Sequence, residues 1–131
     1  MGRRQLPLML SLSALPLALA LAIPSSSQPP VDRQTVTTFN ANVKPILQQS
    51  CVGCHRQGNA KGGLDLSTYE STMKGGVTPK HVVAGKPDES VMLRRIKGLD
   101  NKPRMPKGQA PLSAAKENII RKWIQDGAKK G

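Results

Sequence analysis

The stretch Cys51-Val52-Gly53-Cys54-His55 contains both cysteines of this 131-residue chain. Its pattern, Cys-x-x-Cys-His, is the attachment sequence of a c-type haem. Two thiols at this spacing lie on one turn of backbone, where they can add to the two vinyl groups of a porphyrin. The imidazole that follows then lies against the porphyrin face and can bind the iron. We therefore predict one covalently bound haem c, with Cys51 and Cys54 as its anchors and His55 as an iron ligand.

Three other uses of the cysteine pair are weaker interpretations. A thioredoxin-like redox site belongs in a βαβ context, and the sequence has no such pattern. A zinc site built from the two thiols with His55 and His81 would lack the usual ligand spacing. A disulfide is the ordinary fate of two cysteines outside the cytoplasm, but a histidine directly after the second cysteine favours haem attachment.

Residues 1–22 have the features of a secretory signal peptide. Arg3 and Arg4 form a positive start, a long apolar run follows, and small residues suit cleavage after Ala20 or Ala22. We therefore expect an exported protein with a periplasmic location. An uncleaved N-terminal membrane anchor is the alternative.

A single domain is expected to follow the signal peptide. Residues 23–36 are polar and contain several serines and prolines, which is typical of a flexible linker, and residues 37–131 form the domain. Phe39, Tyr69 and Trp123 are the only aromatic residues, so the side chains alone would build a thin core. A haem would add a large apolar body around which these side chains can pack.

The spacing of apolar residues predicts an all-α domain with no strand of useful length. Four helices are expected, separated by loops rich in glycine and proline, at residues 38–50, 66–73, 88–97 and 113–126. Ser67 is the expected cap of the second helix and Ser113 that of the last, while the third begins at Asp88 or Ser90. Pro45 lies inside the first helix, which should therefore start late or bend.

A helix before the haem motif, a helix near the C-terminus and irregular segments between them resemble the layout of a class I cytochrome c. In that fold the N- and C-terminal helices cross, and loops wrap one haem. Phe39 and Trp123 are the candidate residues for the contact between the two helices. The predicted fold is therefore a small, all-α, cytochrome c-like one.

Short motifs follow one another in order between residues 37 and 128. They are Phe39-x3-Val43-Lys44-Pro45-Ile46-Leu47-x3-Cys51-x2-Cys54-His55, Gly62-Gly63-Leu64-Asp65-Leu66-x-Thr68-Tyr69-Glu70, Gly75-Gly76, Gly85-Lys86-Pro87-Asp88-Glu89-Ser90, Arg104-Met105-Pro106 and Trp123-Ile124-Gln125-Asp126-Gly127-Ala128. As an ordered set they resemble the planctomycete-type cytochrome c domain. Members of this family are often fused to large domains that this sequence does not contain, so the resemblance implies a separate partner protein.

The second axial ligand of the iron is expected to be Met105. This residue lies in a loop between Pro103 and Pro106, shortly before the last predicted helix, and the prolines would stiffen the loop. The family resemblance implies a Met-Pro pair at this place. The second ring nitrogen of His55 is expected to donate to a backbone carbonyl, with residues 58–64 as the nearest candidates.

Three other side chains compete with Met105 for this role. Met92 lies between apolar neighbours on a predicted helix and is more typical of a core residue, and Met73 belongs in the core or on the surface. His81 would give bis-histidine ligation, although a histidine in this glycine-rich loop is otherwise expected to be exposed. If no side chain binds at the sixth position, small ligands can reach the iron.

The chain carries a formal net charge of +12 at pH 7, spread in small clusters along the sequence. A basic face would attract an acidic redox partner, such as a membrane-bound oxidase or dehydrogenase complex, and an ordinary soluble surface is the alternative. The aromatic residues are too few to form a stacking platform, so nucleic acid is not an expected partner. Lys86, Arg94 and Arg104 are candidates to pair with the haem propionates.

These features predict an exported monohaem cytochrome that carries single electrons between redox partners and catalyses no reaction itself. Its iron would be held by His55 and Met105. Two alternatives stay open at this point. One is a haem-bearing accessory or sensor module of a larger exported enzyme. The other is a peroxidase-like or gas-binding haem protein, which would need an open sixth position.

Overall fold

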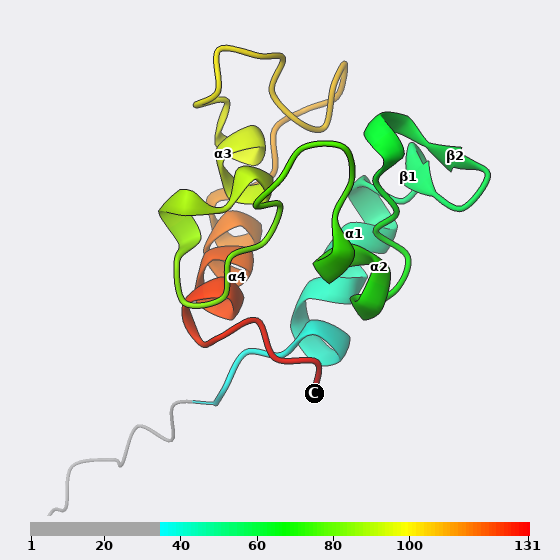
Figure 1. Ribbon diagram of the computed structural model, residues 1–131. Helices are drawn as coiled ribbons and strands as arrows, with labels where there is room; N and C mark the ends of the chain where they lie inside the picture. Colours follow the sequence, from blue (N-terminus) through cyan, green and yellow to red (C-terminus); the bar gives the residue numbers. More distant parts are fainter. Residues whose placement is uncertain (1–34) are drawn as a thin grey trace, which may run out of the picture. The chain divides into compact units, whose positions relative to one another are not determined.

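The computed structural model describes residues 35–131, which belong to one compact unit. This unit is mostly helical and contains one small two-stranded sheet (Figure 1). The predicted signal peptide, residues 1–22, lies outside the described residues, as does nearly all of the predicted linker. In the described part of the chain, no helix combines the length and the apolar character that a membrane crossing requires.

The first helical segment has two parts with different backbone geometry. A π-helical turn, η1 (Phe39–Val43), leads directly into α1 (Lys44–Ser50). The Lys44 N–H donates to the Phe39 carbonyl, five residues earlier. Pro45 follows in the first turn of α1, where its missing N–H costs little. The irregularity predicted at Pro45 is therefore confirmed, and it takes the form of a wide turn before the α-helix.

A short antiparallel ladder follows the haem motif. Strand β1 (His55–Arg56) pairs with β2 (Asn59–Ala60), with His55 opposite Ala60. The sequence did not predict these strands, because two residues are too few to show an alternating pattern. The ladder leads into a 3-10 turn, η2 (Lys61–Gly63). The domain is thus mostly helical, with a minimal sheet at the histidine of the motif.

The second helix, α2 (Tyr69–Lys74), begins later than predicted and has a different cap. Thr68 is the N-cap, and its side chain accepts a hydrogen bond from the Ser71 N–H at 3.1 Å. Ser67, the predicted cap, instead donates its own N–H to Asp65 Oδ1 at 2.9 Å. This local turn keeps Ser67 outside the helix.

Two further helices complete the domain, each close to its predicted position. A 3-10 turn, η3 (Pro87–Glu89), precedes α3 (Val91–Lys97), and α4 (Ala114–Gln125) lies near the C-terminus. Ser113 caps α4 as predicted, because its side chain accepts from the Lys116 N–H. Ser90 is fully buried, and its hydroxyl donates to the Lys86 carbonyl and accepts from the Val83 N–H, each at 2.9 Å. It thereby fastens the loop before α3.

The three aromatic residues meet at the centre of the core. The Phe39 and Trp123 ring centroids are 5.8 Å apart, which confirms the predicted contact between the first and last helical segments. Tyr69 packs edge-on against Phe39, at 5.5 Å. The chain end runs beside the start of η1, where the Phe39 N–H donates to the Lys129 carbonyl at 2.9 Å (Figure 1). The few aromatic residues thus pack the first helical segment of the domain against the last.

Candidate functional site

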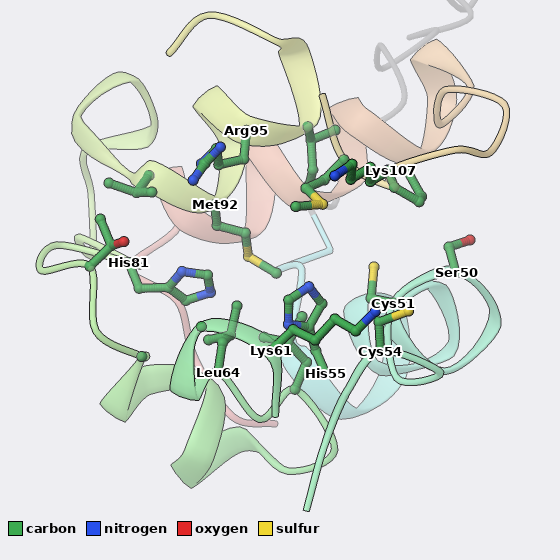
Figure 2. A pocket seen from close by; sticks show the side chains of 18 of the residues that line it. Ser50, Cys51, Cys54, His55, Lys61, Leu64, His81, Met92, Arg95 and Lys107 are labelled. Carbon is green, nitrogen blue, oxygen red and sulfur yellow. The ribbon is translucent and has the colours of Figure 1, made fainter. Parts of the chain in front are cut away.

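A cavity of about 330 Å³ brings the sequence-predicted site residues together. Cys51, Cys54, His55 and Met105 all line it, among mostly apolar neighbours. Figure 2 shows His55, Lys61 and Leu64 on one side of the cavity and Met92, Arg95 and Lys107 on the other. The first side comes from the segment after α1, and the second from α3 and the loop that follows it.

The two cysteines occupy the turn that ends α1. Cys51 is the C-cap, its N–H donates to the Leu47 carbonyl at 2.8 Å, and the Cys54 N–H donates to the Cys51 carbonyl at 3.1 Å. Both thiols are free; Cys51 is half-buried and Cys54 exposed. Burial raises the pKa of the Cys51 thiol to about 11, so that it stays protonated at neutral pH. A redox-active thiol pair needs the opposite shift, which argues against that alternative.

Two backbone hydrogen bonds anchor His55, one through its N–H and one through its carbonyl. Its N–H donates to the Cys51 carbonyl at 3.0 Å, and its carbonyl accepts from the Leu66 N–H at 2.9 Å. The expected hydrogen bond from its ring to a carbonyl of residues 58–64 is absent, because Nδ1 is buried without a partner. One carbonyl of that loop, on Gly62, accepts from the Val77 N–H instead. An imidazole nitrogen left unpaired in a protein interior is costly unless something binds it.

The loop of Met105 is attached to α3 by two hydrogen bonds. The Met105 N–H donates to the Arg95 carbonyl at 3.0 Å. Arg104 Nε donates to the Ile96 carbonyl at 2.9 Å, and its guanidinium lies 3.8 Å from Glu117 Oε1 on α4. These contacts hold the partly buried Met105 at the wall of the cavity.

The competing methionines differ in their relation to the cavity. Met92 is 4% exposed, which agrees with the core position predicted for it, but it also lines the cavity (Figure 2). Met73 packs against the hydrophobic core and does not belong to the cavity lining. Met92 therefore stays a competitor of Met105 for the iron, and Met73 does not.

His81 is the residue that sequence reasoning placed wrongly. It was expected to be an exposed loop histidine, but it is only 9% exposed and lines the cavity. Its Nε2 is buried without a hydrogen-bond partner. Burial, together with the nearby His55, lowers the pKa of His81 to about 4, so the ring is neutral at physiological pH. No local pattern could have revealed this, because the surrounding glycines and prolines are typical of exposed loops.

The charged groups of the cavity all have one sign. Lys61, Arg95 and Lys107 line it, and no Asp or Glu among the described residues does. The three basic residues proposed from the sequence for the propionates lie elsewhere and contact carboxylates: Lys86 with Glu89, Arg94 with Asp100 and Arg104 with Glu117. An apolar cavity with only basic charges suits an apolar ligand that brings its own carboxylates, as haem does.

A bare metal ion fits the site less well than haem. Within residues 35–131, no group of three or more His, Cys, Asp or Glu side chains is arranged to hold an ion. The two thiols beside an imidazole and the basic, apolar lining are features that covalently bound haem accounts for. The residues present therefore fit this cofactor.

Residues 51–109 match the model of a family described as Planctomycete cytochrome C. The match begins at the first cysteine of the haem motif and extends past Met105, so the family resemblance predicted from the motifs is confirmed. A domain of this family is a c-type cytochrome domain that binds haem. Neither a curated protein nor a solved structure matches the chain.

Proposed function

We propose that this chain, whose residues 51–109 match the Planctomycete cytochrome C family, is an exported monohaem cytochrome that carries single electrons between redox proteins. Cys51 and Cys54 would hold the haem by thioether bonds, and His55 and Met105 would bind its iron. One observation carries the proposal. Both thiols, His55 and Met105 line one apolar cavity whose charged residues are all basic.

The protein side chains give this site the properties of an electron carrier. When bound, haem supplies iron that changes its charge by one electron. A thioether opposite an imidazole favours ferrous iron relative to a pair of imidazoles. Leu64 and Ile96, which line the cavity, would exclude water and so disfavour the additional charge of the oxidised form. Both effects raise the reduction potential.

The attachment of the Met105 loop supports electron transfer rather than catalysis. A peroxidase-like or gas-binding site needs an open sixth position, whereas the hydrogen bond from the Met105 N–H to the Arg95 carbonyl holds the Met105 backbone at the cavity wall. The contact between Phe39 and Trp123 supports a class I cytochrome c-like fold. In such a fold, loops cover one haem and leave little room for a substrate.

The basic residues at the cavity support an acidic docking partner. Lys61 and Lys107 both line the cavity, and both are exposed to solvent. A partner with an acidic face, such as a membrane-bound oxidase or dehydrogenase complex, would be steered towards the haem by these charges. Domains of this kind are generally exported, which supports the predicted periplasmic location.

The proposal is tested by the visible spectrum of the protein matured with haem c, compared with the variants Met105→Ala and Met92→Ala. We expect a low-spin spectrum with a far-red methionine–iron band. This band should be lost in Met105→Ala and kept in Met92→Ala, because only the first substitution removes the proposed ligand. Both substitutions truncate a methionine at the same cavity, so Met92→Ala controls for the loss of packing.

Three results would contradict the proposal in different ways. Absence of covalent haem from the matured protein would refute the cytochrome function itself. Loss of the band in Met92→Ala alone would assign the iron to Met92. A high-spin spectrum, or ready binding of carbon monoxide by the unmodified protein, would favour ligand binding or catalysis.

A further inference from the structure

We propose that His81 is a positioning residue whose Nε2–H donates a hydrogen bond to a carboxylate of the bound haem, with Arg95 supplying positive charge at the same end of the cavity. This inference rests on the proposed haem c function. It gives a role to a buried histidine that neither the Cys-x-x-Cys-His motif nor the axial methionine uses.

The location of His81 separates it from the covalent attachment. Figure 2 shows His81 and Arg95 towards one end of the cavity and Cys51 and Cys54 at the other. The two vinyl groups of haem lie on one edge of the porphyrin, and its two carboxylates lie on the opposite edge. Thioether bonds to the cysteines would therefore direct the carboxylates towards the end that contains His81 and Arg95.

His81 has a ring nitrogen without a partner among the described residues, and this nitrogen is a donor when it carries the ring proton. Its Nε2 is buried and unpaired, and none of the described residues lining the cavity carries a carboxylate. A buried polar group without a partner is destabilising, so an acceptor on the ligand would remove this cost. The haem carboxylates are the acceptors that the proposed cofactor brings into this space.

Backbone hydrogen bonds anchor His81 to the start of α3. The His81 carbonyl accepts from the Met92 N–H at 3.0 Å, and the Lys80 carbonyl accepts from the Val91 N–H at 3.0 Å, both at the start of α3. On its other side, a Cβ on Gly75 would lie only 2.8 Å from His81 Cβ. These contacts anchor the His81 backbone, and Figure 2 shows its ring at the end of the cavity away from the cysteines, which favours the carboxylate over axial ligation.

Among the described residues that line the cavity, Arg95 is the one arginine. It projects from α3, the helix whose first turn binds the His81 backbone. Its Nε lies 3.7 Å from Asp100 Oδ2, a loose pair compared with the 2.7 Å between Arg94 and the same carboxylate group. A closer carboxylate from haem could therefore compete for the Arg95 guanidinium.

The test uses the full-length protein carrying covalent haem, with the variants His81→Phe, His81→Gln and Arg95→Gln and the double variant His81→Phe/Arg95→Gln. Phenylalanine keeps the ring but has no donor, whereas glutamine can place an amide N–H near the position of Nε2. Three properties are measured: the methionine–iron band, the reduction potential, and the haem carboxylate bending mode in the resonance Raman spectrum. On the unmodified ferrous protein, NMR looks for a nuclear Overhauser effect between the His81 ring N–H and the carboxylate methylene protons.

The proposal predicts that His81→Phe keeps covalent haem and the methionine–iron band. Its carboxylate mode should shift and its potential should fall, because an unpaired carboxylate stabilises oxidised iron. His81→Gln should restore much of both properties. Arg95→Gln should also lower the potential, and its effect should depend on whether His81 is present. In the unmodified protein the Overhauser effect should be observed.

The outcomes that overturn the inference differ from those that overturn the cytochrome function. An unchanged carboxylate mode and potential in His81→Phe, or no Overhauser effect in the unmodified protein, would refute the hydrogen bond while leaving haem binding intact. A change of axial ligation in His81→Phe would show that His81 binds the iron. Absence of covalent haem from the unmodified protein would refute the proposed function, and the inference with it.

Discussion

Gly75 is the residue on which the position of His81 depends most directly. Its φ is +73°, a conformation that side chains disfavour, and an added Cβ would lie 2.8 Å from His81 Cβ. Gly75 ends α2, so the same glycine stops a helix and makes room for a buried imidazole. The Gly75-Gly76 pair is also one of the motifs from which the family was predicted.

Gly75→Ala should destabilise the domain more than Gly58→Ala does. Both residues have a positive φ, so each substitution strains the backbone. The strain is greater at Gly75, whose φ of +73° and ψ of −167° form a conformation that essentially only glycine adopts. Only Gly75 adds a clash, because a Cβ on Gly58 would meet nothing within 4 Å. Urea unfolding of the two haem-loaded variants measures the difference. Equal losses of unfolding free energy would show that His81 gives way easily.

The first and last helical segments are joined by polar as well as aromatic contacts. The Asp126 carboxylate, at the end of α4, accepts from the Thr37 N–H at 3.1 Å and from Lys122 Nζ at 3.0 Å. Thr37 lies just before η1, so this carboxylate connects elements that are distant in the sequence. The contact reinforces the packing of Phe39 against Trp123.

The stability provided by Asp126 should depend on pH. The hydrogen bond from Lys122, and then that from the Thr37 N–H, lower the pKa of Asp126 below its ordinary value of 3.8. Because the pKa of Asp126 is lower in the folded state, its carboxylate stabilises the fold at pH values above 3.8. This stabilisation is lost as the pH falls through the pKa of the folded state. Asp126→Asn should therefore be less stable than the unmodified protein at neutral pH and approach it in acid.

Unfolding free energies measured across the acid range test this expectation. Lys122→Met should show a smaller effect than Asp126→Asn, because the Thr37 N–H still binds the carboxylate. A stability difference between the unmodified protein and Asp126→Asn that stays constant with pH would show that the carboxylate charge is unimportant.

The distribution of charge determines how the whole molecule would meet a partner. The net charge is +12. Among the described residues, no acidic side chain lines the cavity, and its charged residues are all basic. Glu89, Asp100 and Glu117 form ion pairs with basic residues outside the lining. Long-range attraction acts through the whole surface, whereas the orientation of docking depends on charges near the haem edge.

Charge reversal near the cavity should slow electron transfer to an acidic redox protein. We expect Lys107→Glu to lower the bimolecular rate at low ionic strength more than Lys44→Glu, which makes the same charge change at a residue outside the cavity lining. The difference should shrink as salt is added, because screening weakens steering. Stopped-flow measurements over a range of salt concentrations provide the check. Equal slowing by both variants would indicate that only net charge matters.

The sequence by itself determined the covalent chemistry and most of the helices. Cys51, Cys54 and His55 are neighbours in the chain, so their joint use follows from local spacing alone. The helix positions follow from apolar periodicity, and Met105 was found through its Met-Pro motif. The roles of these residues towards haem stay predictions, although the structure brings them to one cavity.

Only the tertiary structure decided what else surrounds the cavity. His81 and Arg95 enter the lining because α3 binds the preceding loop through backbone hydrogen bonds and because Gly75 permits a close approach. Neither cause has a local sequence signature: backbone donors are the same in almost every residue, and a glycine does not reveal which side chain will pack against it. Burial of a histidine is a property of long-range packing, which residue spacing does not encode.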